Sequence, residues 1–111
     1  MIVCKFALPV FDLPVMAKAY EYATGIEANV GELLLIGERI TNLERLFNVR
    51  EGIKREDDNL PRKITDPNQT RFTEQTQLDR MLDDYYDARG WDRASGLPRI
   101  EKLEELGLKV G

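Results

Sequence analysis

The feature that most constrains this chain is a long helical pattern between Val30 and Glu51. Its apolar side chains recur at steps of three and four residues, which places them on one face of an α-helix: Leu33, Ile36, Ile40, Leu43 and Phe47. Asn29 is a suitable N-cap, Glu32 stands three residues later as in a capping box, and Gly52 suits the C-terminus. Such a helix is about 33 Å long. We therefore expect an all-α fold organised around this helix, with its apolar stripe toward the core.

Three arginines on this helix lack the usual local partners. Arg39, Arg45 and Arg50 have no carboxylate three or four residues away on either side, although a solvated helix face usually pairs its charges at that spacing. Two interpretations stay open. The arginine stems lie along the edge of the core with their guanidinium groups in water, or these groups reach carboxylates or carbonyls elsewhere in the fold or on a partner. We predict structural or domain-interface contacts for all three.

The rest of the chain predicts three further helices. Asp12-Leu13-Pro14 begins a helix before the long one, a third helix spans about 76–89, and a short last helix spans about 99–106. We expect about four helices in a single domain over residues 1–111. The two remaining stretches are an extended N-terminal arm and a long irregular loop, residues 1–13 and 53–74.

Composition argues against several classes of function. No apolar run approaches the roughly 20 residues that span a bilayer, and the apolar N-terminus lacks the basic leader of a signal peptide. The net charge is −4, from 16 basic and 20 acidic residues, which disfavours nucleic-acid binding. The single cysteine and the lack of a secretory signal favour a reducing cytoplasm. The chain has no histidine, the most common general base and transition-metal ligand, and we predict no catalytic residue within it.

Three groups of residues carry chemistry in principle. Cys4 has apolar neighbours and, from the residues alone, is more often a small buried hydrophobe than a reactive thiol. The acidic clusters 56–58 and 83–84 lack the alternating ligands and glycine of a calcium loop, so a solvated face is the expected interpretation. An aromatic cluster at a helix end is expected to pack in the core rather than to stack a base or a sugar: Tyr85, Tyr86 and Trp91.

Four segments have an order and spacing that identify a family. They are GERITNLERLFNVREG at 37–52, REDDNLP at 55–61, MLDDYYDARGWD at 81–92 and GLPRIEKLEELGL at 96–108. Together they resemble the C-terminal region of the tungsten-containing aldehyde ferredoxin oxidoreductase family, and the resemblance covers nearly the whole chain. It implies the C-terminal helical domain of an enzyme that converts aldehydes to carboxylic acids and passes electrons to ferredoxin.

The resemblance also implies cofactors, which are a tungsten bis-pterin and a 4Fe–4S cluster in the intact enzyme and none in the isolated chain. Cys4 stands where the family motif D-x-x-G-L-C closes with the fourth cluster ligand, so Cys4 is implied as a cofactor-binding metal ligand. Met1-Ile2-Val3 offers neither the aspartate nor the glycine of that motif, and one thiolate cannot hold a four-iron cluster. The family's catalytic residues lie upstream of the matched region. We therefore expect the isolated chain to be inactive.

A second hypothesis is a stand-alone helical module that binds a companion polypeptide carrying the cofactor domains. Its contact surface would be formed by apolar residues of the N-terminal arm: Ile2, Val3, Phe6, Leu8 and Phe11. Under both hypotheses we expect no binding to nucleic acid or to membranes, and a homo-oligomeric state stays open.

Overall fold

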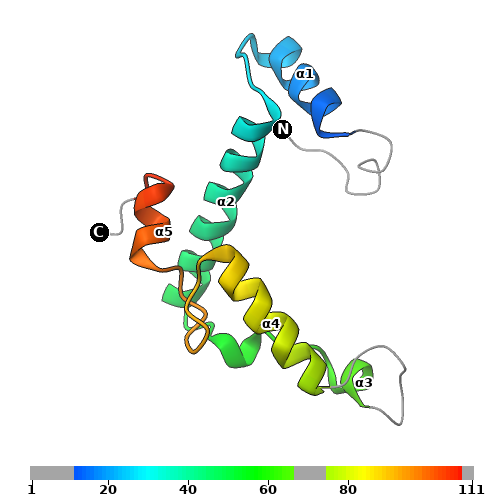
Figure 1. Ribbon diagram of the computed structural model, residues 1–111, viewed down its shortest axis with the longest axis vertical. Coiled ribbons are helices and arrows are strands. Elements are labelled where there is room, and N and C mark those ends of the chain that lie inside the picture. The colour runs from blue at the N-terminus through cyan, green and yellow to red at the C-terminus, as the bar shows by residue number, and fades with distance from the viewer. Residues whose placement is uncertain (1–11, 67–74, 109–111) are drawn as a thin grey trace. The chain divides into compact units, whose positions relative to one another are not determined.

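The chain is built from helices (Figure 1). The computed structural model describes residues 12–66 and 75–108. Its helices follow one another in this order: α1 Leu13–Thr24, α2 Val30–Arg50, the 3-10 helix η2 Arg55–Asp57, α3 Arg62–Thr65, α4 Gln75–Arg89 and α5 Ile100–Glu105. The described ranges contain no strand, and an isolated β-bridge joins Trp91 to Pro98. The predicted all-α class is confirmed. None of the helices in these ranges is both long and apolar enough to cross a lipid bilayer.

The four predicted helices are all present, each with ends close to those expected. Two short additional helices, η2 and α3, lie inside the stretch predicted to be irregular. At the start of η2 the Asp57 carboxylate accepts a hydrogen bond from the Lys54 N–H at 2.8 Å, and Pro61 directly precedes α3. Residues 67–74 of the predicted loop and 1–11 of the predicted arm lie outside the described residues.

The chain divides into two compact units, Met1–Ile40 and Thr41–Gly111, with the boundary inside α2. The expectation of a single domain over residues 1–111 stays a prediction. The described part of the first unit consists of α1, a short connection and the start of α2. In this unit the two ends of α1 and the start of α2 are capped by local hydrogen bonds.

The helix starts in the first unit are those predicted. The Asp12 carboxylate accepts a hydrogen bond from the Val15 N–H at 3.0 Å at the start of α1, and Gly25, with φ of 71°, ends that helix. At the start of α2, Asn29 and Glu32 form a reciprocal capping box. The Glu32 N–H donates to Asn29 Oδ1 at 3.0 Å, and the Asn29 N–H donates to Glu32 Oε2 at 2.7 Å.

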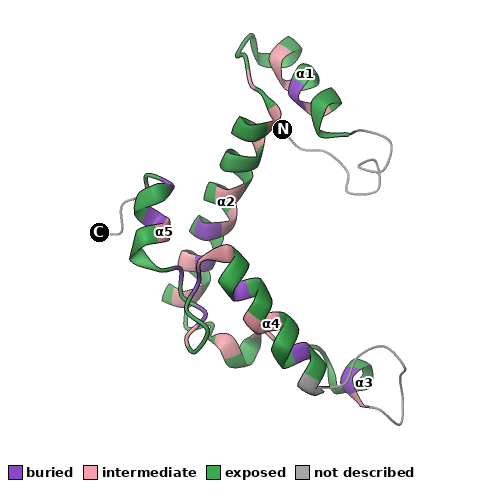
Figure 2. Ribbon diagram, in the orientation of Figure 1, coloured by how far each residue is buried: buried purple, intermediate pink, exposed green. Residues whose placement is uncertain are grey.

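The apolar core of the second unit comes from α4, the turn after it and α5 (Figure 2). Its buried apolar members are Leu78, Tyr86, Trp91, Leu103 and Leu106. Gly90, with φ of 68°, turns the chain at the end of α4, and the Trp91 N–H then donates to the Tyr86 carbonyl at 2.8 Å. The Trp91 ring centroid lies 5.7 Å from those of Tyr85 and Tyr86. Tyr86 and Trp91 are buried as predicted, but Tyr85 is 42% exposed, so the predicted core packing is confirmed for two of the three rings.

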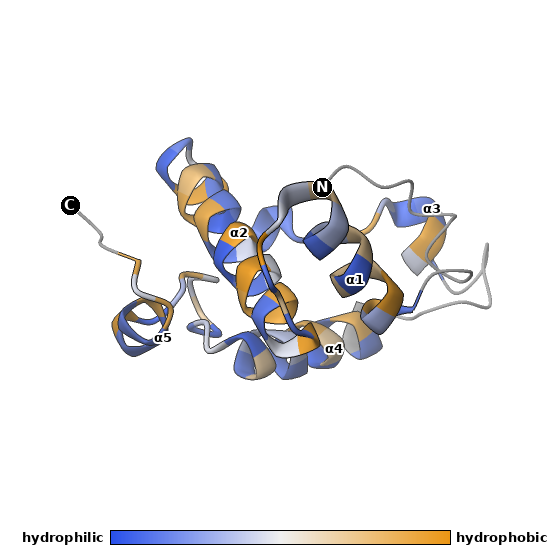
Figure 3. Ribbon diagram, turned by 90° about the horizontal axis from the view of Figure 1, so that it is seen from above, coloured by the Kyte–Doolittle hydropathy of each residue, from blue (hydrophilic) through white to orange (hydrophobic). Residues whose placement is uncertain are grey.

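The apolar stripe of α2 is largely exposed, contrary to the expectation that it faces the core, and of its five residues Leu33 alone is half-buried. Hydrophobic and hydrophilic positions alternate along α2 (Figure 3). In the second unit Leu43 and Phe47 are 52% and 55% exposed, whereas Asn42 and Arg45 are buried. Because successive residues turn by about 100°, Leu43 and Phe47, each two residues from Arg45, lie on the opposite face of the helix. In the first unit Ile36 and Ile40 are also exposed. Within the second unit, Leu43 and Phe47 face outward because Asn42 and Arg45, on the other side of the helix, have partners inside that unit.

Candidate functional site

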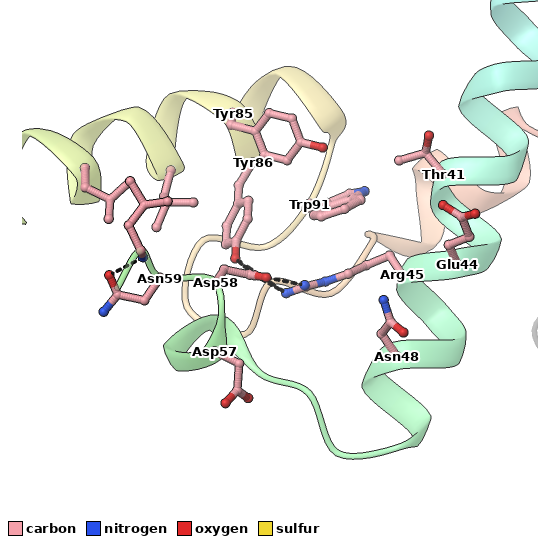
Figure 4. Close-up of a pocket in the computed structure, with 13 residues that line it drawn as sticks. Thr41, Glu44, Arg45, Asn48, Asp57, Asp58, Asn59, Tyr85, Tyr86 and Trp91 are labelled. Carbon is pink, nitrogen blue, oxygen red and sulfur yellow. Dashed lines mark hydrogen bonds and ion pairs between the residues drawn. The ribbon is translucent and has the colours of Figure 1, made fainter. Parts of the chain in front are cut away.

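A buried arginine is the centre of the candidate site. Arg45 lies on the inward face of α2, and its side chain is 6% exposed. Arginine is almost never this buried unless it is paired. No carboxylate stands three or four residues away on α2, so the partners come from other elements. In Figure 4 these partners converge on the guanidinium group from the segment after α2 and from α4.

The guanidinium group of Arg45 meets Asp58 in a two-pronged ion pair. Nη1 donates to Asp58 Oδ1 at 2.9 Å, and Nη2 lies 2.6 Å from Oδ2. Asp58 directly follows η2, and its N–H donates to the Arg55 carbonyl at 3.0 Å, which fixes the local backbone. Bidentate pairs of this kind are stronger and more directional than single hydrogen bonds. The pair therefore fastens the segment after α2 back onto the helix.

Tyr86 extends this network from α4. Its hydroxyl donates a hydrogen bond to the Asp58 carboxylate, and Arg45 Nη2 donates to the same hydroxyl oxygen at 3.4 Å. Two guanidinium carbons lie within cation–π range of the Tyr86 ring centroid, that of Arg45 at 5.8 Å and that of Arg55 at 5.1 Å. Tyr86 thus contributes both its hydroxyl and its ring face to holding the two arginines.

The contact between Arg45 Nε and the backbone at position 96 requires a glycine there. Arg45 Nε donates to the Gly96 carbonyl at 2.8 Å. Gly96 has φ of +71°, a conformation that side chains with a Cβ disfavour. A Cβ added there would overlap Arg45 Nη2 and stand 3.1 Å from the Tyr86 hydroxyl. Both the backbone conformation and the close approach of the guanidinium group therefore require glycine.

Asn42 is the second buried polar residue on the inward face of α2. The Trp91 indole N–H donates to Asn42 Oδ1 at 2.8 Å, with both residues buried. The Arg45 guanidinium carbon lies 5.0 Å from the Trp91 ring centroid, so the aromatic ring also covers the charge. Across the described ranges, every buried side-chain nitrogen or oxygen has a hydrogen-bond partner. The polar interior is thus fully satisfied, as buried polar groups in native proteins are.

Arg55 joins the segment after α2 to two further elements. Its Nη1 donates to the Arg93 carbonyl at 2.9 Å, and its Nη2 donates to Asp83 Oδ1 on α4 at 2.7 Å. Arg93 in turn pairs with Asp87, also on α4, through Nε at 2.9 Å. The segment after α2 and the turn before α5 are therefore both fixed to α4 by arginine contacts.

The electrostatics keep Asp58 ionised and Tyr86 protonated at neutral pH. Burial by itself favours the neutral carboxyl, but hydrogen bonds from Arg45 and Tyr86 outweigh it and hold the pKa of Asp58 below its ordinary value of 3.8. Burial, together with the hydrogen bond to Asp58, raises the pKa of Tyr86 to about 12. Because neither group changes protonation near neutral pH, the network holds together the elements that it joins across this range.

A pocket of about 420 Å³ borders the network. Its walls come from α2, the segment after it and α4, and Figure 4 shows the lining carboxylates Glu44 and Asp57 and the amide of Asn48 beside the network. Each guanidinium nitrogen of Arg45 already donates a hydrogen bond, to Asp58, to Tyr86 or to the Gly96 carbonyl. The pocket therefore has a polar wall but no unused cation from Arg45 for an anionic ligand.

The residues predicted as sites have different surroundings. Arg45 is buried in the network, whereas the side chain of Arg50 is 71% exposed. Arg50 Nε lies 3.2 Å from Oε1 of the adjacent Glu51, and the Arg50 guanidinium carbon lies 4.9 Å from the Phe47 ring centroid. Arg39 is exposed on the first unit's part of α2. Cys4 lies outside the described residues, as do the predicted contact residues Ile2, Val3, Phe6, Leu8 and Phe11. The roles assigned to Cys4 and to the three arginines stay predictions.

Asp58 departs from the solvated face predicted for its acidic cluster. Glu56 and Asp57 are exposed, but the Asp58 side chain is 25% exposed and bound to Arg45 and Tyr86. The signal for this pairing is an arginine without a local carboxylate, followed by an acidic cluster in the segment after the helix. No comparable signal singles out Tyr86, and the same holds for Asn42 and Gly96.

Known proteins match most of this chain. Residues 1–108 match the family model for aldehyde ferredoxin oxidoreductase, domains 2 and 3. The tungsten-containing aldehyde ferredoxin oxidoreductase of Pyrococcus furiosus is 40% identical over 90 residues, and that of Thermococcus kodakarensis is 39% identical over 90 residues. Each alignment covers 78% of this chain and 15% of the relative. The chain therefore spans about 15% of the length of these curated relatives.

A solved structure has a similar fold and sequence. It is the active site complex BamBC of benzoyl coenzyme A reductase in complex with 1,5-dienoyl-CoA. The match has a TM-score of 0.74 and 30% identity, and it covers 88% of this chain and 14% of that chain. In this comparison, too, the chain corresponds to a small part of a longer protein.

Proposed function

Because this chain belongs to the aldehyde ferredoxin oxidoreductase family, we propose that it is the C-terminal helical domain of a tungsten–pterin oxidoreductase. That enzyme would convert aldehydes to carboxylates and pass the electrons to ferredoxin. One observation carries the proposal, namely the match of residues 1–108 to domains 2 and 3 of the family. The chain spans about 15% of its relatives, so the activity is proposed for the whole enzyme.

In this proposal the chain is a structural domain of the enzyme and supplies no catalytic group. It has no histidine, and Asp58 and Tyr86 keep their protonation states near neutral pH. Within residues 12–66 and 75–108, no three His, Cys, Asp or Glu side chains are grouped to hold a metal ion. No reaction step is therefore assigned to these residues.

The partners and location follow from the proposal. The upstream domains would carry the tungsten bis-pterin and three ligands of the 4Fe–4S cluster, with Cys4 as the fourth. Ferredoxin would receive the electrons, and a homo-oligomer of the whole enzyme is compatible with this arrangement. The single cysteine of the chain supports a reducing, cytoplasmic location.

The test compares the isolated chain with the native protein that contains it. The native protein is purified through a tag fused to this segment, and both samples are assayed for tungsten and for aldehyde-dependent reduction of a viologen dye. We expect tungsten and activity in the native protein and neither in the isolated chain. Native protein without tungsten, or dye reduction by the tungsten-free isolated chain, would overturn the proposal.

A second candidate function is an interaction module that binds a separate, cofactor-bearing polypeptide. The observation that favours it is the exposure of Leu43 and Phe47, 52% and 55%, on one face of α2. Peptide mapping after denaturing size separation distinguishes the two. Peptides of this segment in a much larger chain indicate a domain of one enzyme. The same peptides in a chain of this size, isolated together with a tungsten-bearing companion, indicate the module.

A further inference from the structure

The part of α2 in the second unit presents an apolar face to solvent. Leu43 and Phe47 are four residues apart, so they are neighbours on one side of the helix, and each is more than half exposed. A hollow of about 470 Å³ lies against them and is lined by Leu43, Glu44, Phe47 and Asn48. Large apolar side chains at this spacing are typical of a helix that packs against another protein element.

This face is held outward by the contacts on the other side of the helix. Arg45 is fastened to Asp58 and to the Gly96 carbonyl, and Asn42 is fastened to the Trp91 indole. Turning α2 to bury Leu43 and Phe47 would break these buried contacts and leave a buried charge without its partner. The exposure is therefore built into the fold of the second unit.

Charges of opposite sign border the two sides of this face. Relative to Phe47, Arg50 lies about 60° around the helix in one direction and Glu44 about 60° in the other. Both are exposed, and the Arg50 guanidinium carbon lies 4.9 Å from the Phe47 ring centroid. A complementary partner presents apolar side chains with an acidic border toward Arg50 and a basic border toward Glu44.

The length of the relatives indicates what covers the face. The chain spans about 15% of the curated relatives, and its residues 1–108 match the family model for domains 2 and 3. In the relatives, the sequence outside the matched segment is therefore several times longer than the segment itself, and it includes a domain other than these two. These observations favour the rest of the enzyme as the partner that covers this face.

We propose that the face of α2 formed by Leu43 and Phe47, bordered by Glu44 and Arg50, is the surface on which the cofactor-bearing part of the oxidoreductase docks. This inference rests on the proposed function. The partner element is amphipathic, with its apolar side chains against Leu43 and Phe47.

The test places a photo-crosslinker in this face of the intact native protein. Phe47→p-benzoylphenylalanine is compared with a control, Glu104→p-benzoylphenylalanine, at an exposed position of α5. The protein is purified through a tag on this segment and illuminated, and crosslinked peptides are identified by mass spectrometry. From position 47 we expect at least several-fold more crosslinking than from position 104, to a peptide of the tungsten-bearing part of the enzyme.

Two results would overturn the docking surface alone: tungsten present but no excess crosslinking from position 47, or crosslinks from position 47 to a second copy of this segment. Purified protein without tungsten would overturn the proposed function and the docking surface together. A double variant, Leu43→Ser with Phe47→Ser, gives a second readout in the intact protein. It is expected to raise the rate of proteolytic cleavage between this segment and the rest of the enzyme at least tenfold relative to wild type, and an unchanged rate counts against the proposal.

Discussion

In the second unit, the polar residues of α2 face inward and its apolar residues face outward, the reverse of the usual arrangement in an amphipathic helix. Inside, Asn42 and Arg45 are buried and hydrogen-bonded to Trp91, Asp58 and the Gly96 carbonyl. Outside, the apolar side chains of Leu43 and Phe47 are more than half exposed. A helix of a complete globular domain normally turns its apolar stripe to the core. One side of α2 thus organises this segment, and the exposure of the other side supports the proposed docking of the rest of the enzyme there.

The two faces differ in what a substitution removes. On the inward face, loss of a polar group leaves its partner buried without a hydrogen bond, and the penalty for that is large. On the outward face, truncating an exposed apolar side chain removes few contacts within the segment. Stability measurements on the isolated chain therefore separate the faces, and fluorescence of Trp91, the one tryptophan of the chain, reports directly on the second unit.

Among changes to the polar network, the largest effect is expected for Arg45→Ala. This change leaves the Asp58 carboxylate, whose side chain is 25% exposed, without its counter-charge, and we expect the free energy of unfolding to fall by about 3 kcal/mol. Urea unfolding followed by Trp91 fluorescence measures it. Arg50→Ala is the matched control because Arg50 is exposed, and its effect should stay within about 0.5 kcal/mol. Equal effects of the two changes would show that burial of Arg45 does not organise the unit.

A smaller loss in the free energy of unfolding, about 2 kcal/mol, is expected for Gly96→Ala. It arises from the positive φ and from displacement of the Arg45 guanidinium group. Gly107→Ala is a close control, since Gly107 has φ of +67° and nothing within 4 Å of an added Cβ. Both variants are compared by urea unfolding. The loss in Gly96→Ala beyond that in Gly107→Ala measures the cost of displacing Arg45. Equal losses in the two variants would show that the close approach of Arg45 has no effect on stability.

Tyr86→Phe is expected to change the pH dependence of stability more than stability itself. The pKa of Tyr86 is raised from 10.0 to about 12, so the folded chain keeps a proton that the unfolded chain loses. The free energy of unfolding therefore falls as pH rises from 10.0 toward about 12. At neutral pH the variant should lose about 1.5 kcal/mol, for one hydrogen bond to a charged group.

The measurement is the urea midpoint of wild type and Tyr86→Phe across this alkaline range. In the variant the contribution of Tyr86 to the alkaline decline should be absent, because phenylalanine keeps the ring but carries no proton to lose. Parallel pH profiles would show that Tyr86 is not held protonated by its burial and its bond to Asp58.

The helices of this fold could be predicted from the sequence, because their ends are set by nearby residues. Asp12 and the Asn29–Glu32 pair cap helix starts through partners three residues away, and Gly25 ends α1. The short helices η2 and α3 have no such periodic signal and were not predicted. Local patterns of this kind determine where a helix lies along the chain.

The orientation of α2 and the partners of Arg45 could not be predicted in the same way. The apolar stripe alone predicts that Leu43 and Phe47 face the core, because periodicity does not show what covers a face. Asp58, Tyr86 and Gly96 stand 13, 41 and 51 residues from Arg45 along the chain. Only the lack of a carboxylate three or four residues from Arg45 pointed to a distant partner, and it did not say which one.

The most direct test of this account is the stability of Phe47→Ala in the isolated chain, measured by urea unfolding beside Leu106→Ala. Leu106 is 1% exposed and Phe47 is 55% exposed. We predict a loss of about 2 to 5 kcal/mol for Leu106→Ala and a change within about 0.5 kcal/mol for Phe47→Ala. A loss in Phe47→Ala as large as that in Leu106→Ala would place Phe47 in the core and contradict an outward apolar face on α2.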